Sequence, residues 1–306
     1  MQRKAILLFA LMFVLSISFV FASAAELDQA DVLYKQDKLE EAKIVLDKLL
    51  VNATDPVSKA EILWRLSRVT LNIGDELDAE GATDDVLFAK YEEAQAYAEE
   101  SIALHPMSKG YQWRSASVGR WGETKGPLNA LSKAPLLRDD LTVVVNDYND
   151  VDNSDAWYVL GQLYFQLPGW PISFGDLDVA ISYTRKALDT IPSDELYPNH
   201  YLALSKMLWK RNWNVSKRSS KINDFQKSWN KANQTNIERH KYYEGAEGTS
   251  KVPFYSTVAL NKMSDKQEAV LLLNYAIAAF KVWKNPSRGD LRSYNDIQAM
   301  LKEYGY

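Results

Sequence analysis

The stretch from Ser154 to Pro192 constrains the fold more than any other part of this chain. It holds two amphipathic helical patterns separated by the segment LPGWPISFG. The spacing of its marker residues is that of a tetratricopeptide repeat (TPR), a pair of antiparallel helices. Small residues let the two helices approach closely, and a proline ends the second helix because it cannot continue it. The marker residues are Trp157, Leu160, Gly161, Tyr164, Ala180, Ala187, Leu188 and Pro192.

Related patterns precede this stretch and extend its register along the chain. Residues 25–56 predict a helical hairpin without insertion. Residues 60–74 and 91–106 predict a second hairpin, whose helices are separated by an acidic surface loop over residues 75–89. A third hairpin begins near Lys109, and its second helix runs from about Pro127 to Tyr148. Another helix follows Pro198, which completes a TPR-like region over residues 25–213.

Residues 214–306 predict a helical extension of a different kind. A basic segment, residues 214–262, precedes an apolar helix that begins after Ser264 and a terminal helix over residues 289–304. No part of the chain alternates polar and apolar residues for long enough to predict a sheet. We therefore expect an all-α protein, an irregular TPR-like helical-hairpin solenoid with extra C-terminal helices that pack on the array or cap it.

The N-terminus has the pattern of an export signal. The basic tetrapeptide MQRK precedes a long apolar run, and Ala22-Ser23-Ala24 has the form of a cleavage site. We interpret residues 1–24 as a signal peptide. The alternative is an uncleaved membrane anchor, which would be the only contact with a membrane. The absence of cysteine suits a secreted chain held together by packing alone, and a bacterial periplasm is the expected location.

Catalytic and cofactor motifs are missing from the sequence. The three histidines, His105, His200 and His240, have no partner at metal-ligand spacing, and there is no cysteine to act as a nucleophile or zinc ligand. Neither a G-x-S-x-G motif nor a phosphate-binding glycine loop is present. The formal net charge of −4 gives no basic surface for nucleic acid. We expect no metal, no cofactor and no enzymatic activity, although an enzyme on an α/α scaffold remains an alternative that a buried acid/base cluster would favour.

The inner face of a TPR array is lined by the first helix of each repeat, which makes the side chains on that face the candidate site. The register predicts that this groove carries aromatic, amide and arginine side chains in unusual number. Such a groove suits an extended peptide, or an apolar molecule whose anionic end is held by arginine. The competing interpretation is that the C-terminal helices fill the groove and the tryptophans belong to the core. The predicted groove residues are Trp64, Arg68, Asn72, Trp113, Ser117, Arg120, Trp121, Tyr158, Gln162 and Phe165.

The segment LPGWPISFG is the second candidate site. Its proline and glycine residues predict a stiff loop, and Trp170 and Phe174 make it apolar. Either these two side chains seal the edge of their own hairpin, or they form a contact for a partner at the mouth of the groove.

Three segments carry a resemblance to known proteins: YAEESIALHP, GYQWRSASVGRW and DAWYVLGQLYFQLPGWPISFGDLDVAISYTRKAL. Over residues 60–213 the chain resembles a divergent TPR family that includes bacterial periplasmic proteins associated with TRAP transporters. It is more distantly similar to the regulator of microtubule dynamics proteins. The pair Tyr111 and Trp113 and the loop over Gly169–Gly175 are the most specific parts. The resemblance implies irregular helical repeats around a ligand-accessible pore and a periplasmic solute-binding protein as partner.

Together these observations predict an exported TPR-like binding scaffold of the cell envelope, an accessory to solute uptake with a protein or peptide partner. A carrier for a small hydrophobic molecule or organic acid, with a pore under the TPR face, is the alternative function.

Overall fold

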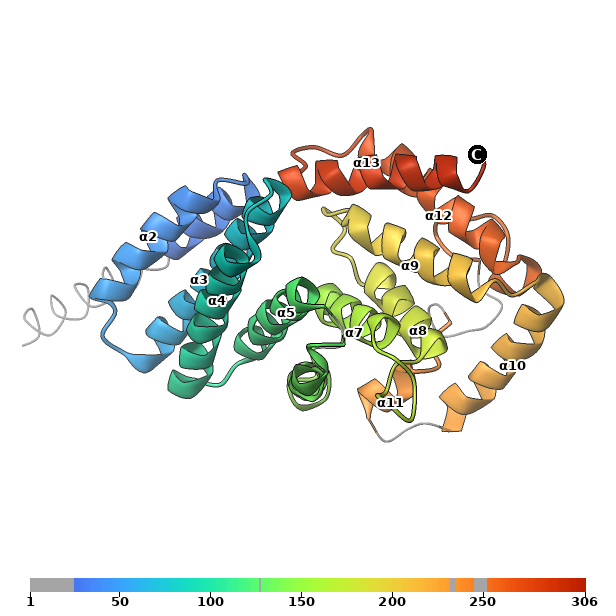
Figure 1. The fold of residues 1–306 in the computed structure, drawn as a ribbon, viewed down its shortest axis with the longest axis horizontal. Coiled ribbons are helices and arrows are strands. Elements are labelled where there is room, and N and C mark those ends of the chain that lie inside the picture. Colours follow the sequence, from blue (N-terminus) through green and yellow to red (C-terminus); the bar gives the residue numbers. More distant parts are fainter. Residues whose placement is uncertain (1–24, 127, 232–234, 245–251) are drawn as a thin grey trace, which may run out of the picture. The chain divides into compact units, whose positions relative to one another are not determined.

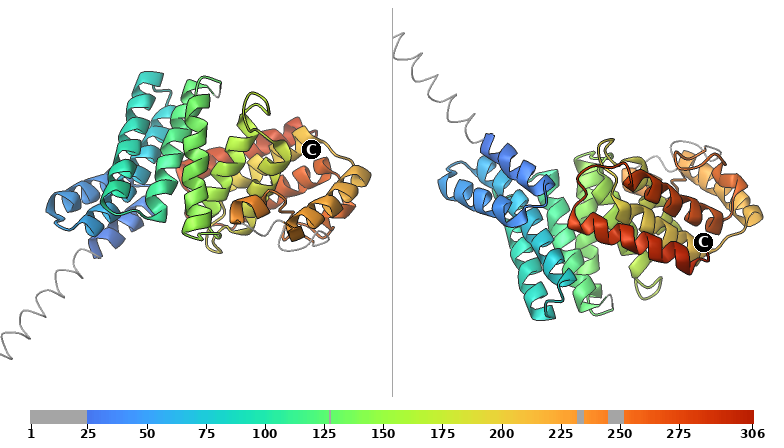
Figure 2. Two further views of the ribbon diagram at one scale, coloured as in Figure 1. Left: turned by 90° about the horizontal axis from the view of Figure 1, so that it is seen from below. Right: turned by 90° about the horizontal axis from the view of Figure 1, so that it is seen from above.

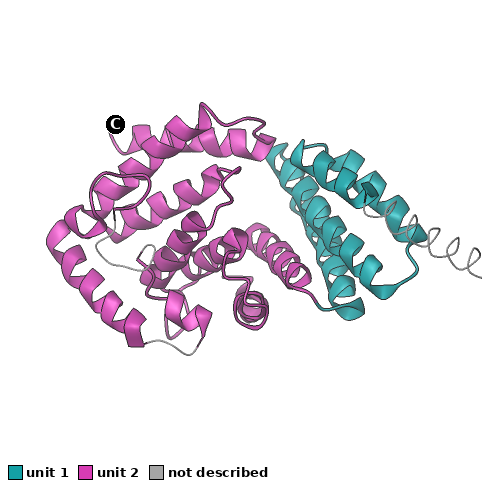
Figure 3. Ribbon diagram, turned by 180° about the vertical axis from the view of Figure 1, so that it is seen from behind, with its two compact units in different colours: residues 1–106 teal, residues 107–306 magenta. Residues whose placement is uncertain are grey.

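The computed structural model describes residues 25–126, 128–231, 235–244 and 252–306. Within them the secondary structure is helical and contains no strand, which confirms the expected all-α fold (Figure 1). The chain forms two compact units, residues 1–106 and residues 107–306 (Figure 3). The predicted signal peptide lies outside the described residues.

Unit 1 is built from hairpins of helices. Residues 25–35 are helical and are followed by α2 (Leu39–Asn52), α3 (Pro56–Ala79) and α4 (Asp84–Leu104). Asp55 caps α3 by accepting from the backbone N–H of Ser58 at 2.8 Å, and Pro56 occupies the first turn, where its missing N–H costs nothing. The apolar faces of these helices share one core made of Ala30, Leu39, Ala42, Leu46, Leu49, Ile62, Leu63, Leu66 and Val69.

The prediction of an acidic surface loop over residues 75–89 is wrong. Helix α3 continues to Ala79 and α4 already starts at Asp84, so most of this segment is helical and belongs to α3 or α4. Gly81, at φ +83°, sits in the short connection where the chain reverses. Asp84 and Asp85 then lie in the first turn of α4, where carboxylates interact favourably with the helix dipole. Asp84 and Asp85 therefore stabilise the start of α4.

Unit 2 begins with α5 (Ser108–Lys125), close to the predicted start at Lys109. The next strip of helix consists of the short η1 (Leu131–Lys133), α6 (Ala134–Thr142) and the π-helical η2 (Val143–Asp147). It is the looser second helix that the sequence predicts, although the α-helix itself begins later, at Ala134.

The hairpin of α7 (Ser154–Gln166) and α8 (Leu177–Asp189) agrees with the predicted boundaries. Its helices meet at Gly161, where an added Cβ would lie 2.2 Å from Thr184 Oγ1 and 3.2 Å from the carbonyl oxygen of Ala180. Only glycine leaves room for this approach. Trp157 and Tyr183, both fully buried, fill the seam beside it with their rings 5.4 Å apart.

The remaining helices are α9 (Pro198–Arg211), α10 (Val215–Lys231), α11 (Asn236–His240), the short η3 (Leu260–Lys262), α12 (Asp265–Phe280) and α13 (Arg288–Glu303). Four of them, α9, α11, α12 and α13, share their core with the α7–α8 hairpin. Ser264 caps α12 in a reciprocal capping box with Gln267, as its position in the sequence predicts. Helices α12 and α13 both pack against α9, where Tyr304 stacks on Trp209 at 3.5 Å. The C-terminal helices therefore cover α9.

Candidate functional site

Two helices of unit 2, α5 and α7, carry seven of the ten side chains that the sequence assigns to the groove, and α9 contacts α7. Helix α7 contacts both α5 and α9, and polar contacts cross both seams. Gln166 on α7 donates to Glu123 on α5 at 3.0 Å, and Glu123 also pairs with Arg120 at 2.8 Å. Lys210 on α9 lies 4.7 Å from the ring centroid of Phe165 on α7. The contacts form a continuous ladder, which we call the α5–α7–α9 face.

On α5 the predicted residues are partly exposed except for Ser117, which is buried and donates to the carbonyl oxygen of Trp113 at 2.8 Å. The Nε1 atom of Trp113 is buried and makes no hydrogen bond to any described residue. Trp121 lies under the ammonium group of Lys133 at 4.0 Å. The side chain of Arg120 is 44% exposed, so its guanidinium is accessible to a partner.

On α7 the central residue is Tyr158. Its ring stacks on His200 of α9, with 4.1 Å between centroids and an interplanar angle of 10°. Burial raises the pKa of Tyr158 to about 12, although Arg120 and a hydrogen bond with Asn199 act against the shift. The phenol is therefore protonated at every physiological pH and can serve as a hydrogen-bond donor. Gln162, one turn further along α7, is partly exposed on the same helix.

The groove residues of the second predicted hairpin lie in unit 1 and are already paired within it. Trp64 is only 7% exposed and donates to Glu61 at 2.8 Å. Arg68 forms an ion pair with Asp31 at 2.5 Å and lies over the ring of Tyr34. The amide of Asn72 donates to the carbonyl oxygen of Arg68 at 2.8 Å. These contacts stabilise unit 1 whether or not a partner binds there.

The two loop candidates have different surroundings. Phe174 packs edge-on against Tyr164 at 5.3 Å, and Arg138 of α6 lies 5.0 Å from its ring centroid. Trp170 is 89% exposed. The two side chains that the sequence treats together therefore point to different environments.

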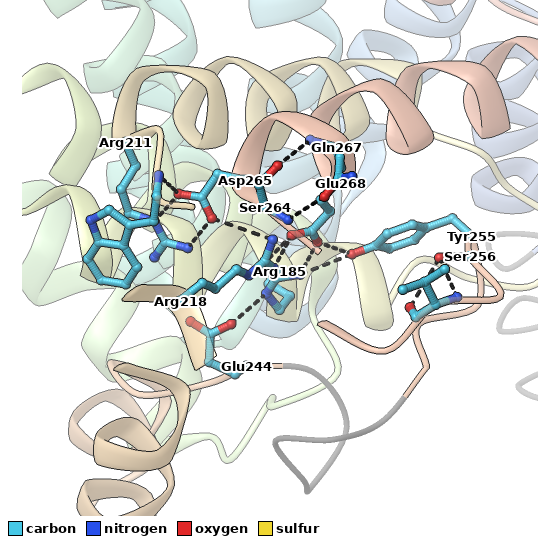
Figure 4. A network of polar contacts seen from close by, with 12 residues as sticks. Arg185, Arg211, Arg218, Glu244, Tyr255, Ser256, Ser264, Asp265, Gln267 and Glu268 are labelled. Atoms are coloured by element: carbon cyan, nitrogen blue, oxygen red, sulfur yellow. Dashed lines mark hydrogen bonds and ion pairs between the residues drawn. The ribbon is translucent and has the colours of Figure 1, made fainter. Parts of the chain in front are cut away.

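A second polar cluster, which the sequence does not predict, is buried among the helices of unit 2 (Figure 4). It joins Arg185 of α8, Arg218 of α10 and Glu268 of α12, with side chains that are at most 2% exposed. Glu268 accepts from both guanidinium groups and from the hydroxyl of Tyr255. Arg185 Nη1 also lies 3.0 Å from that hydroxyl. We call these residues, with the partners described next, the buried charge cluster.

Three further carboxylates join the cluster. Asp265 accepts from Nε and Nη2 of Arg211 at 2.8 and 2.9 Å, and Arg218 Nη1 lies 3.4 Å from it. Glu244 faces Arg185 Nε at 3.5 Å, and the partly exposed Asp178 lies 3.3 Å from Arg211 Nη1. Three arginines thus meet four carboxylates, and every arginine of the cluster already has a carboxylate partner.

The protonation chemistry of the cluster does not suit general acid/base catalysis. Burial alone would raise the pKa of Glu268, but Arg185 and Arg218 hold it well below its usual range. Burial and the adjacent Glu268 raise the pKa of Tyr255 well above its usual value. Neither group exchanges its proton near neutral pH, where a general base is useful. The cluster is convergent and buried, yet its chemistry is that of a fixed ion pair network.

Sequence patterns could have pointed to this cluster. Arg185 stands between Ile181 and Leu188 on a helical stripe that is otherwise apolar. Glu268 occupies the same kind of position ahead of Leu272 on α12. A charged residue on a buried stripe needs a partner. Which residue is the partner depends on segments far away in the chain, and a single sequence does not reveal that pairing.

Over the part of the chain that the structure describes, no group of His, Asp and Glu residues is arranged to hold a metal ion. Within the same residues, no helix is both long and apolar enough to cross a bilayer.

Comparison with known proteins matches part of the chain to a family model. The model of the family "Regulator of microtubule dynamics protein 1-3" matches residues 26–171, slightly less than half of the chain. The match supports the distant resemblance to that family and ends inside the α7–α8 loop, at Pro171. The likeness to TPR proteins and to TRAP-associated proteins stays a prediction. No curated protein is significantly similar.

Proposed function

We propose that this protein is a TPR-like binding scaffold whose α5–α7–α9 face takes up an extended segment of a partner protein. The observation that carries the proposal is the ladder of contacts across α5, α7 and α9, because it presents aromatic, amide and guanidinium groups on one support. Partly exposed tryptophan and tyrosine supply contact area at low entropic cost, and arginine adds directional hydrogen bonds.

Two further observations support a binding protein over an enzyme. In the buried charge cluster, Arg185 and Arg218 hold the pKa of Glu268 well below its usual range. The face itself carries Tyr158, whose phenol stays protonated, and Arg120, which pairs with Glu123, and it has no histidine with a near-neutral pKa, since burial lowers the pKa of His200 to about 3.

The setting in which we place this scaffold is the bacterial periplasm. In this proposal residues 1–24 direct export, and the partner is a solute-binding or transport protein of the envelope. Fractionation of the tagged full chain tests the location, because a periplasmic protein is released by osmotic shock and a retained anchor is not.

The experiment that tests the binding face is site-specific photocrosslinking in the native envelope. A photoreactive amino acid at position 162 should capture a partner, whereas the same group at Lys227, an exposed residue of α10, should not. Replacing Trp113 and Trp121 by alanine should weaken capture by tenfold or more, since an aromatic hot spot contributes about 2 kcal/mol. Circular dichroism of the double variant establishes that it is folded.

Two results would remove the proposal. Equal capture by the folded double variant would show that the tryptophans take no part. A retained small hydrophobic molecule or organic acid in native mass spectrometry, with no protein crosslink from position 162, would establish the carrier function instead.

A further inference from the structure

The two ends of the loop between α7 and α8 are held together by hydrogen bonds and close packing. The backbone N–H of Asp176 donates to the carbonyl oxygen of Tyr164 at 3.0 Å, and that of Gly175 donates to Pro168 at 3.0 Å. A Cβ on Gly175 would lie 1.9 Å from the carbonyl oxygen of Leu167, so the backbone at the end of the loop is in direct contact with the backbone at its start. Phe174 anchors the loop on Tyr164. The base of this loop is held in place.

The tip of the same loop is apolar and faces solvent. Trp170 is 89% exposed and Ile172 is 69% exposed, with Pro171 between them also exposed. Removing large apolar side chains from water is favourable, so an exposed apolar tip has burial energy left to gain from a partner surface. A fixed base beneath an exposed indole is the arrangement expected of a preorganised contact.

A second apolar tip lies in the loop between α5 and α6. Leu128 in that loop is 69% exposed. Both views in Figure 2 show the described residues of the α5–α6 loop on the same side of unit 2 as the α7–α8 loop. The two tips can therefore meet one surface together.

The shape and charge of this side favour a lipid surface over a protein. A stable protein interface takes about 20–30 residues on each side, with a continuous apolar centre. Here two separate tips project, and Arg138 of the neighbouring α6 is paired with Asp139 at 2.8 Å. Isolated apolar tips fit a deformable apolar medium, and tryptophan prefers the level of the lipid head groups. The loop segments themselves, residues 128–130 and 168–175, hold no charged side chain that would attract anionic lipid.

We propose that the tips of the α5–α6 and α7–α8 loops, with Trp170 at the centre, insert into the interfacial layer of a bilayer of zwitterionic lipid. The attachment goes beyond the binding face, and it involves neither the α5–α7–α9 ladder nor residues 1–24. Because only three apolar side chains take part, the binding is weak and reversible, comparable to a single acyl anchor.

The absence of native cysteine allows a direct test on the full chain. Ile172→Cys is labelled with an environment-sensitive fluorophore and titrated with phosphatidylcholine vesicles. The matched control is Val282→Cys, which is 80% exposed at the end of α12 in the same unit. We expect a blue-shifted, brighter emission from position 172, quenched by lipids that carry a nitroxide near the head group, and no change at position 282. Because both labels are on the same unit, the difference between positions 172 and 282 reports insertion of the loop even if another segment of the chain also binds the vesicle.

A second variant measures the contribution of the indole. Adding Trp170→Ala to the labelled Ile172→Cys protein should raise the lipid concentration at half-response by tenfold or more, since burial of an indole is worth at least about 1.4 kcal/mol. The fold is not at risk because the indole makes almost no contact with the protein.

Three outcomes would overturn the proposal. Equal responses from positions 172 and 282 would mean that the loops do not insert. A response that requires phosphatidylglycerol would assign the contact to basic residues. A label at position 172 that ignores vesicles but responds to an envelope protein fraction would make the tip a protein contact.

Discussion

The α7–α8 hairpin and the buried charge cluster are neighbours in unit 2 that are held together by different physics. The hairpin depends on shape: glycine at position 161 brings two helices together, and Trp157 and Tyr183 fill the seam. The charge cluster depends on pairing: Arg185, carried by the same α8, meets Glu268, which is 83 residues away in the sequence. One helix thus presents a tightly packed face to α7 and a buried cation to α12.

This difference indicates which kind of substitution destabilises each region most. Shape complementarity along a hairpin is local, and its marker residues recur in every member of a repeat class. A buried ion pair contributes little net stability when intact, but removing one partner leaves an uncompensated charge in a medium that cannot solvate it. The hairpin should therefore tolerate moderate changes in volume better than the cluster tolerates the loss of a charge.

Replacing Glu268 by alanine should have the largest effect. Arg185 and Arg218 both lose their main partner while their side chains stay 2% exposed or less. The expected loss is about 3–5 kcal/mol of unfolding free energy, measured by urea denaturation. Glu99→Ala, an exposed position on α4, is the control and should change little. A loss below that of Gly161→Ala would contradict the comparison.

Replacing Gly161 by alanine should have an intermediate effect. The new methyl group would collide with Thr184 and press on the carbonyl of Ala180, at a cost of about 1–3 kcal/mol. The matched control is Gly119→Ala on α5, where the nearest atom to the new Cβ is Leu137 Cδ2 at 3.5 Å. There alanine should stabilise the helix by up to about 1 kcal/mol. If both changes had the same sign, the close approach at Gly161 would not matter energetically.

The next largest effect is expected from acid, which should reduce the contribution of two buried histidines near the hairpin at a higher pH than it reduces that of the charge cluster. Burial lowers the pKa of His200 to about 3 and that of His240, which lies 4.6 Å from the Trp157 ring, to about 4. In the unfolded chain histidine titrates near 6.5. Between about pH 6.5 and pH 4 the unfolded chain therefore binds more protons, and the unfolding free energy falls as the pH falls, by up to roughly 1 kcal/mol per pH unit for each histidine.

The charge cluster should keep its contribution over most of that window. The depressed pKa of Glu268 means that its stabilisation is present above the unfolded value of about 4.3 and is lost only as the pH falls below it. Urea unfolding between about pH 7 and pH 5 measures the slope. His200→Gln and His240→Gln should each flatten it, and a slope unchanged in both variants would disprove the assignment.

The smallest effect is expected at an exposed ion pair of α10. Lys227 and Asp224 lie 3.6 Å apart with side chains 72% and 56% exposed. Solvent screens such a pair, so Asp224→Asn should change the unfolding free energy by less than about 0.5 kcal/mol. A loss close to that of Glu268→Ala would mean that burial does not separate the two kinds of pair.

Much of the helix pattern could be predicted from the sequence, but less of the site. The limits of α7, α8 and α12 follow from local signals: a small residue at a close contact, a capping Ser264, a terminating proline. The segment over residues 75–89 misled because acidic composition resembles a loop, whereas the same residues are good at starting and extending helices. On α5 and α7 the helical period placed Arg120 and Tyr158 on helices that touch. It could not show that Trp64 and Arg68 are paired inside unit 1.

By itself the sequence determined the all-helical class, the limits of the α7–α8 hairpin and the position of the apolar loop, because each depends on residues within a few turns of one another. Only the tertiary structure decided which charged residues are buried together and that Trp170 is exposed while Phe174 packs. The physical reason is distance along the chain. A helix face is encoded every three or four residues, whereas the partner of Arg185 and the solvent around Trp170 depend on how segments remote in sequence pack.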